Sequence, residues 1–204
     1  MQFEYPTVFF NIIFTFLIFV FSIIFGIFSV NYMLNTAIDF DSLKIREWES
    51  YLHIGTPKAD PYTRARTAKR GDISLGYPEN LIFQLWTDNQ GHPLRPNCHY
   101  LLTGHIPETR LFTLYLADKF LKPYTSTNNI PSALHTYNVI YENDGSLRIH
   151  ISPTPQTGNW LASTSKKEFG IILNLYDTSI ISATALRKPM MPSVERIPSG
   201  EKCV

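Results

Sequence analysis

The sequence lacks the features by which several large classes of protein are recognised. Its 204 residues carry 18 Lys and Arg against 17 Asp and Glu, and a net charge of +1 gives no electrostatic basis for binding a nucleic acid. It contains no glycine-rich phosphate-binding loop. Its two cysteines and six histidines form no Cys-x-x-Cys or His-x-x-x-His pair, so the sequence predicts no metal site and no cofactor.

Charged residues are also missing from residues 5–38, and residues 8–30 are almost entirely apolar. A helix over residues 8–30 would be about 34 Å long, enough to cross a bilayer core of about 30 Å. In hydrocarbon, a helix satisfies its own backbone polar groups. We therefore predict an N-terminal membrane anchor over residues 1–37, which contacts the lipid bilayer through residues 8–30, and a single β-rich soluble domain over residues 38–204.

A cleaved signal peptide is the alternative to a permanent anchor. The only charge before the apolar run is Glu4, whereas a signal peptide begins with basic residues, and the run exceeds the usual length of about 7–15 residues. The best cleavage site is the bond after Ala37. Its −3 position is occupied by Asn35, where a small residue is needed. These features favour a signal-anchor.

Within the anchor, Ser22 and Gly26 have a spacing that lets two membrane helices pack closely. This pair predicts a homodimer through the membrane helix. Small residues are also common in membrane spans that do not associate, and that alternative stays open.

Two short helices are expected before the strands begin. Residues 41–53 carry apolar residues at mixed helical spacing and are expected to form the first. Residues 60–70 are expected to form the second, because Asp60 followed by proline suits a helix start and Gly71 suits a helix end.

From residue 81 onward, short alternating apolar runs separated by Pro, Gly and Asn predict strands. The expected strands are residues 81–86, 98–104, 111–117, 134–141, 147–152 and 169–176. A tight turn at 143–145 would pair 134–141 with 147–152, and the proline-containing tail 187–204 reads as irregular. The pattern predicts a mainly β fold, a jelly-roll-like β-sandwich preceded by two short helices and one N-terminal transmembrane helix.

Few residues offer catalytic chemistry. Residues 163–166 match Ser-x-x-Lys, but they lie in a polar loop rather than at a helix start, so we assign no catalytic residue. A hydrolase site would need histidines such as His99, His105 or His150 to converge with carboxylates from separate strands. Trp160, which follows Asn159, offers a stacking face for a sugar or an apolar ligand, or else it fills the end of the sandwich.

The two cysteines, Cys98 and Cys203, would close a loop of about 105 residues if joined, and such a bond would contribute about 4–5 kcal/mol. A pair of cysteines with no others fits a disulfide in an oxidising compartment. Two unrelated buried thiols fit the composition almost as well. The first basic residues after the span, Lys44 and Arg46, favour a cytoplasmic domain by the positive-inside rule.

Several short blocks occur in a characteristic order. They are Asp60-Pro61-Tyr62 with Arg64-Ala65, Gly71 and Leu75; Asp88 to Gly91 with Pro93; Cys98-x-Tyr100 with Gly104; Leu114-Tyr115; Gly158-Asn159-Trp160-Leu161; Leu175-Tyr176-Asp177; and Cys203 near the end. Together they resemble the bacterial domain-of-unknown-function family 1214 (DUF1214) over about residues 60–204. Ile82 departs from the family, whose members tend to have an aromatic residue there.

The resemblance implies a jelly-roll-like sandwich in proteins that are exported or anchored in the inner membrane of Gram-negative bacteria. Larger relatives carry a second, upstream domain in place of the span and short helices. The resemblance implies no established reaction. Together with the cysteine pair, it favours a periplasmic domain over the cytoplasmic one that the charge count indicates.

We therefore predict a single-pass protein of the bacterial inner membrane whose domain is a binding or interaction module rather than an enzyme. Its ligand would be a protein or a glycan, and the expected binding residues are Tyr62, Arg64, Asn159 and Trp160. One alternative is a hydrolase acting on envelope material. Another is a structural partner that assembles through its transmembrane helix.

Overall fold

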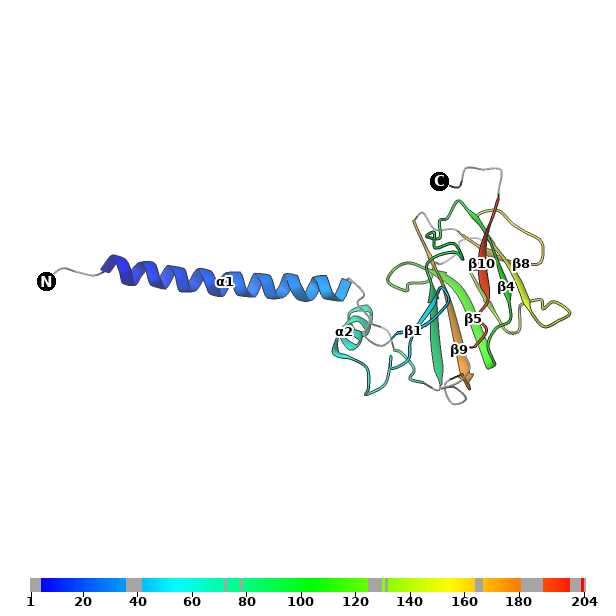
Figure 1. Cartoon of the computed structure of the whole chain (residues 1–204), viewed down its shortest axis with the longest axis horizontal. Coiled ribbons are helices and arrows are strands. Elements are labelled where there is room, and N and C mark those ends of the chain that lie inside the picture. Colours follow the sequence, from blue (N-terminus) through cyan, green and yellow to red (C-terminus); the bar gives the residue numbers. More distant parts are fainter. Residues whose placement is uncertain are drawn as a thin grey trace.

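The computed structural model describes residues 5–35, 42–71, 73–77, 79–124, 130, 132–163, 167–180, 189–198 and 203. A long N-terminal helix, α1 (Tyr5–Asn35), leads into a domain of two β-sheets (Figure 1). No residue in the most apolar part of α1 is buried against the rest of the chain, and the helix is long and apolar enough to cross a membrane. The predicted boundary between residues 37 and 38 lies outside the described residues.

The first sheet has six strands and the second has four. In spatial order the first contains β1 (Ser42–Ile45), β2 (Trp48–Tyr51), β3 (Asn80–Leu85), β9 (Gly170–Thr178), β5 (Thr109–Ala117) and β6 (Ala133–His135). The second contains β10 (Ser193–Ile197), β4 (His99–Gly104), β7 (Leu147–Ser152) and β8 (Asn159–Ala162). Neighbouring strands are antiparallel except β7 and β8, which are parallel.

The hydrophobic core lies between the two sheets. Alternate residues of each strand point inward, so Phe83, Phe112 and Leu173 of the first sheet meet Leu102 and Ile149 of the second, all at 0–2% exposure. The predicted mainly β fold is confirmed, and the strands expected at 81–86, 98–104, 111–117, 147–152 and 169–176 are present within two residues at each end.

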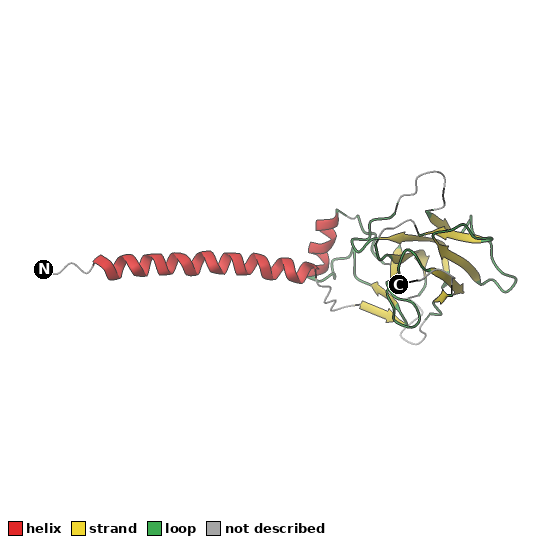
Figure 2. Cartoon of the chain, turned by 90° about the horizontal axis from the view of Figure 1, so that it is seen from above, coloured by secondary structure: helices red, strands yellow, loops and turns green. Residues whose placement is uncertain are grey.

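The second predicted helix is also confirmed as α2 (Pro61–Arg70). The Asp60 carboxylate accepts hydrogen bonds from the backbone N–H groups of Tyr62 (2.9 Å) and Thr63 (3.1 Å), and Gly71 ends the helix with a φ of 72°. Seen from two directions, α2 lies at the junction between α1 and the sheets (Figures 1 and 2). Its last residue, Arg70, lines a pocket on the outer face of the six-stranded sheet.

The prediction of a helix over residues 41–53 is wrong, because this segment forms the hairpin β1–β2. Ile45 and Trp48 lie opposite each other across a two-residue turn in which Arg46 has a φ of 55°. Both apolar side chains enter the core, at 4% and 0% exposure, and the Trp48 indole N–H donates to the Pro192 carbonyl oxygen at 2.7 Å. Burial of these two side chains in the core therefore favours a hairpin here, although the spacing of the apolar residues also suits a helix.

Two further expectations are corrected. The segment expected at 134–141 forms only the short strand β6, which pairs with β5 in the other sheet, and a single bridge joins Tyr141 to Leu147. The tail expected to be irregular contains β10, which pairs with β4 along its whole length. Pro192 and Pro198 flank β10 and leave its ladder intact.

Candidate functional site

The outer face of the six-stranded sheet carries amide side chains that are buried. Asn80 and Gln84 on β3 and Asn174 on β9 are exposed by only 8–9%. They alternate with the core residues, so they point away from the core, and Asn174 pairs with Ile82 between the two amides of β3. Polar side chains on an outer face are normally solvated, and their burial indicates that another part of the chain covers them.

Part of this cover comes from the described residues between 51 and 76, which include α2. Gly55 and Gly76 bring its two halves together, since a Cβ at Gly55 would lie 2.5 Å from the Ser74 carbonyl oxygen. Arg64 fixes the start of α2 to the preceding loop, because its guanidinium donates to the carbonyl oxygens of Ala59 (2.9 Å) and Pro57. The segment thus folds back on itself and lies over β3.

A pocket of about 200 Å³ lies between this cover and the sheet. Its walls combine amides, tyrosines, aliphatic side chains and one guanidinium. The lining residues are Tyr51, Ile54, Arg70, Ile73, Ser74, Asn80, Ile82, Gln84, Tyr115 and Leu121. Among the described residues of the lining there is no carboxylate, imidazole or thiol, the groups that most often act as acids, bases, nucleophiles or metal ligands.

Two amide oxygens in this region have no hydrogen-bond partner among the residues that the structure describes. They are Oδ1 of Asn80, which lines the pocket, and Oδ1 of Asn174, whose amide nitrogen donates to Thr113 Oγ1 at 3.2 Å. Leaving such a buried acceptor unpaired costs about 1–3 kcal/mol. A ligand that donates an O–H or N–H into the pocket would satisfy the Asn80 oxygen, which marks the pocket as the candidate binding site.

The four predicted binding residues are not brought together. Tyr62 and Arg64 lie on α2, beside the six-stranded sheet, whereas Asn159 and Trp160 lie on β8, on the side of the domain away from α1 (Figure 1). Tyr62 is 38% exposed and remains accessible. None of the four lines the pocket.

Asn159 is held by the fold itself. Its Oδ1 accepts from the Ile140 N–H at 2.7 Å, and its Nδ2 donates to the carbonyl oxygens of Ile140 (2.6 Å) and Arg148 (3.0 Å). The side chain therefore joins β8 and β7 to the preceding loop. Trp160 is half-buried, and its indole N–H donates to the Ser152 carbonyl oxygen at 3.2 Å.

The histidines considered for a hydrolase do not meet a carboxylate in the pocket. His105 contacts the Asp144 carbonyl oxygen at 3.2 Å, and His99 and His150 lie on β4 and β7 of the other sheet. Among the residues that the structure describes, no group of three or more His, Cys, Asp or Glu side chains is placed to hold a metal ion. Ser163 donates to the Pro96 carbonyl oxygen at 2.8 Å, and residues 164–166 of the Ser-x-x-Lys match lie outside the described ranges.

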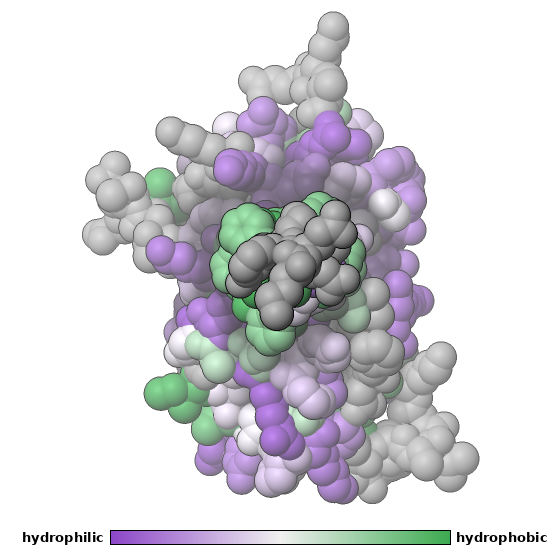
Figure 3. All heavy atoms as spheres, turned by 90° about the vertical axis from the view of Figure 1, so that its left-hand side faces the viewer, coloured by the Kyte–Doolittle hydropathy of each residue, from purple (hydrophilic) through white to green (hydrophobic). Residues whose placement is uncertain are grey.

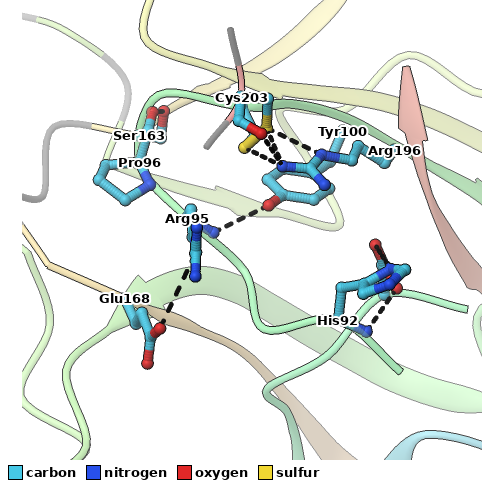
Figure 4. The surroundings of a disulfide bond; sticks show 10 residues. His92, Arg95, Pro96, Tyr100, Ser163, Glu168, Arg196 and Cys203 are labelled. Carbon is cyan, nitrogen blue, oxygen red and sulfur yellow. Dashed lines mark hydrogen bonds and ion pairs between the residues drawn. A yellow bond between two sulfur atoms is a disulfide. The ribbon is translucent and has the colours of Figure 1, made fainter. Parts of the chain in front are cut away.

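The disulfide between Cys98 and Cys203 is present, with the two Cα atoms 5.1 Å apart. Arg196 on β10 lies beside it (Figure 4). Its guanidinium donates to Cys203 Sγ at 2.8 Å, to Cys98 Sγ at 2.9 Å and to the Cys203 carbonyl oxygen at 2.9 Å. Nearby, burial raises the pKa of Tyr100, whose hydroxyl accepts from the Arg95 N–H at 2.8 Å. The disulfide joins the end of the chain to β4.

The sequence did not predict Asn80, Gln84, Tyr115 and Asn174 as residues of this region. One signal was available, since asparagine is depleted in strands and two amides alternate with apolar residues along β3. Ile82, the departure from the family pattern, lies between these amides and lines the pocket rather than the core. Ser22 and Gly26 are exposed on α1, and the homodimer through them stays a prediction.

Comparison with known proteins supports the fold. The structure resembles the crystal structure of the VPA0106 protein from Vibrio parahaemolyticus, with a TM-score of 0.55 and 16% identity over 72% of this chain. This chain covers 39% of that protein, or about two-fifths of its length. A putative uncharacterized protein from Burkholderia cenocepacia matches with a TM-score of 0.40 and 17% identity, over 72% of this chain and 47% of that one.

No curated protein matches the sequence. The family model described as "Protein of unknown function (DUF1214)" matches residues 79–180, from β3 to the residues after β9. The match contains the pocket floor on β3 and β5, whereas the covering segment 51–76 precedes it. The matched range is shorter than residues 60–204, the range expected from the short sequence blocks. The chain belongs to this family, the DUF1214 proteins of unknown function.

Proposed function

We propose that this protein is a membrane-anchored binding module of the cell envelope, and that its ligand occupies the pocket over the six-stranded sheet. The observation that carries the proposal is the unpaired Oδ1 of Asn80, a buried acceptor that lines the pocket. A fold does not normally retain such a group without a partner, and binding sites are where such groups are retained.

The lining favours a hydroxyl-rich ligand, such as one sugar unit of a glycan. Sugar hydroxyls donate to amide oxygens and accept from amide N–H groups, which Asn80 and Gln84 provide. The C–H faces of a sugar pack against tyrosine and aliphatic walls, which Tyr51, Tyr115 and Ile82 provide. Because the pocket is smaller than a typical cofactor site of about 300–1,000 Å³, it suits a small group rather than a large cofactor.

For its location, we propose the bacterial inner membrane, with α1 as a single span and the domain on the periplasmic side. The length and apolarity of α1 support the span. The Cys98–Cys203 disulfide supports an oxidising compartment, because cytoplasmic thiols are normally kept reduced. The basic residues Lys44 and Arg46 oppose this orientation, although whole domains translocate largely regardless of such charges.

The test compares Asn80→Leu with the unchanged chain. We expect Asn80→Leu to lose binding of soluble cell-wall disaccharides, measured by saturation-transfer NMR on the detergent-solubilised protein. The free energy of unfolding should not fall, and should rise by up to about 1–3 kcal/mol, because an unpaired buried acceptor is removed.

Gln156→Ala, an exposed change in the β7–β8 loop, is the matched control and should leave both quantities unchanged. If Asn80→Leu instead lowers the free energy of unfolding and leaves disaccharide binding intact, Asn80 serves the fold and the proposal is wrong.

A further inference from the structure

The position of α2 relative to the end of α1 fixes its height above the bilayer, given the membrane anchoring proposed above. Lys69 Nζ lies 3.3 Å from Oδ1 of Asn35, the last residue of α1. Asn35 follows the apolar run 8–30 by five residues, or about 7.5 Å along a helix. The headgroup layer on each side of a bilayer is about 5–7 Å thick. Lys69 therefore lies at the outer edge of the headgroup layer.

The composition of α2 matches that location. Its ten residues include Arg64, Arg66, Lys69 and Arg70 and no acidic residue. Basic residues next to a membrane span are attracted to anionic lipid, and this attraction falls off within a Debye length of about 8 Å at physiological salt. Because Lys69 contacts the end of α1, its charge lies within that distance.

Apolar side chains lie beside these charges. Ile73 is 97% exposed and Leu75 is 49% exposed, both in the loop that follows α2, and Tyr62 at its start is 38% exposed. A view along α1 toward the domain shows hydrophobic and hydrophilic surface together around the helix on this face (Figure 3). Basic residues combined with exposed aliphatic and aromatic side chains are typical of segments that lie in a membrane interface.

We infer that α2 and residues 73–75 form an interfacial surface that rests on anionic phospholipid headgroups, with Ile73 inserted among them. The surface continues the contact that α1 makes with the bilayer, and its positive charge complements the lipid phosphates. Arg70 and Ile73 also line the pocket, so the same contact places the pocket next to the membrane surface.

The test uses the full-length chain in vesicles of phosphatidylcholine, with or without phosphatidylglycerol, and a fluorophore attached at Ile73→Cys. The native cysteines are paired, so the new thiol is labelled selectively. Headgroup spin-labelled lipid quenches only a probe that lies at the interface. We expect strong quenching at Ile73→Cys in phosphatidylglycerol vesicles, and loss of that quenching at high salt or on Lys69→Glu. A probe at Gln156→Cys, in the β7–β8 loop, should not be quenched.

Equal quenching at Ile73→Cys and Gln156→Cys would overturn the inference, as would quenching that neither phosphatidylglycerol nor Lys69→Glu alters. Resistance of the chain to carbonate extraction reports the anchor separately. A chain that stays in the vesicles but shows no quenching at Ile73→Cys retains its anchor and lacks the interfacial surface. A chain that carbonate extracts has no span, and both proposals then fail. Unchanged melting of Lys69→Glu confirms that its effect is not unfolding.

Discussion

Gly170, the first residue of β9, lies directly against the indole ring of Trp86. A Cβ placed on Gly170 would come within 2.7–2.8 Å of three ring carbons, closer than carbon atoms approach in folded proteins. Trp86 follows β3, the neighbour of β9 in the sheet, so the indole covers the end of this strand pair. The contact is possible only because residue 170 has no side chain.

Gly170→Ala should therefore destabilise the domain by about 1–3 kcal/mol, the usual cost of adding a methyl group to a well-packed site. Urea unfolding of the detergent-solubilised chain measures the loss. Replacing the large ring in the double variant Gly170→Ala/Trp86→Leu should recover part of it, relative to Trp86→Leu alone, because the two side chains then no longer overlap. Equal costs of Gly170→Ala in the two backgrounds would show that the ring contact does not limit residue 170.

The N-cap of α2 gives a pH-dependent prediction. Partial burial by itself would raise the pKa of Asp60, but hydrogen bonds from Thr63 and Tyr62 and the charge of Arg66 outweigh it, so the pKa lies below the ordinary value of 3.8. The ionised carboxylate then stabilises the fold at pH values above 3.8. This contribution is lost as the pH falls through the lower pKa of the folded state.

Asp60→Ala should cost about 1 kcal/mol at neutral pH, whereas Asp60→Asn, which caps equally well, should cost little. The measurement is the difference in free energy of unfolding between the unchanged chain and Asp60→Asn as a function of pH. Taking the difference cancels the contribution of the other carboxylates, which titrate in both proteins. The unchanged chain should lose stability relative to Asp60→Asn below pH 3.8, and a difference that stays constant with pH would contradict the role of the charge.

Replacing Asn159 tests whether this predicted binding residue stabilises the fold or binds the ligand. Asn159→Ala leaves the N–H and carbonyl of Ile140 and the carbonyl of Arg148 without this partner, and should cost about 1–3 kcal/mol. Ligand binding, measured below the melting temperature, should be unchanged because the pocket lies at the other sheet. A stable Asn159→Ala protein that fails to bind would instead restore the sequence-based prediction.

The elements that the sequence predicts correctly are those encoded by patterns among neighbouring residues. Alternation defines β7 and β9, and the cap residues Asp60 and Gly71 define α2, because each signal depends on neighbours in the chain. The hairpin β1–β2 is different. Ile45 and Trp48 face each other across a two-residue turn, so they are three apart in sequence, which is also a helical spacing. Only their burial in the core separates the two structures.

The candidate site was harder to predict for a related reason. Asn80 and Gln84 line a pocket whose other walls include residues from the segment before β3 and Leu121 after β5, and no local pattern encodes those long-range contacts. In contrast, Gly158, Asn159 and Trp160 form a conspicuous motif that the structure uses to join β8 to its neighbours. The distinctive local motif therefore holds strands together, whereas the pocket is lined by strand residues that form no distinctive motif.

The disulfide gives the last prediction, which also tests the orientation of the domain. In isolated membranes, thiol labelling under denaturing conditions should modify Cys98 and Cys203 only after reduction, as expected for a disulfide in an oxidising compartment. Labelling without reductant would show free thiols. It would favour the cytoplasmic orientation that Lys44 and Arg46 indicate, and would contradict the proposed envelope location.

Reduction should also lower the free energy of unfolding by about 4–5 kcal/mol, because the bond closes a loop of 105 residues. The double variant Cys98→Ser/Cys203→Ser is the matched control: it should start at the lower stability and should not respond to reductant. The effect should be concentrated at the end of the chain, since Arg196 donates to both sulfur atoms and to the Cys203 carbonyl oxygen. Hydrogen exchange should then show β10 losing protection before β4, because β10 is the edge strand of its sheet and β4 remains paired with β7.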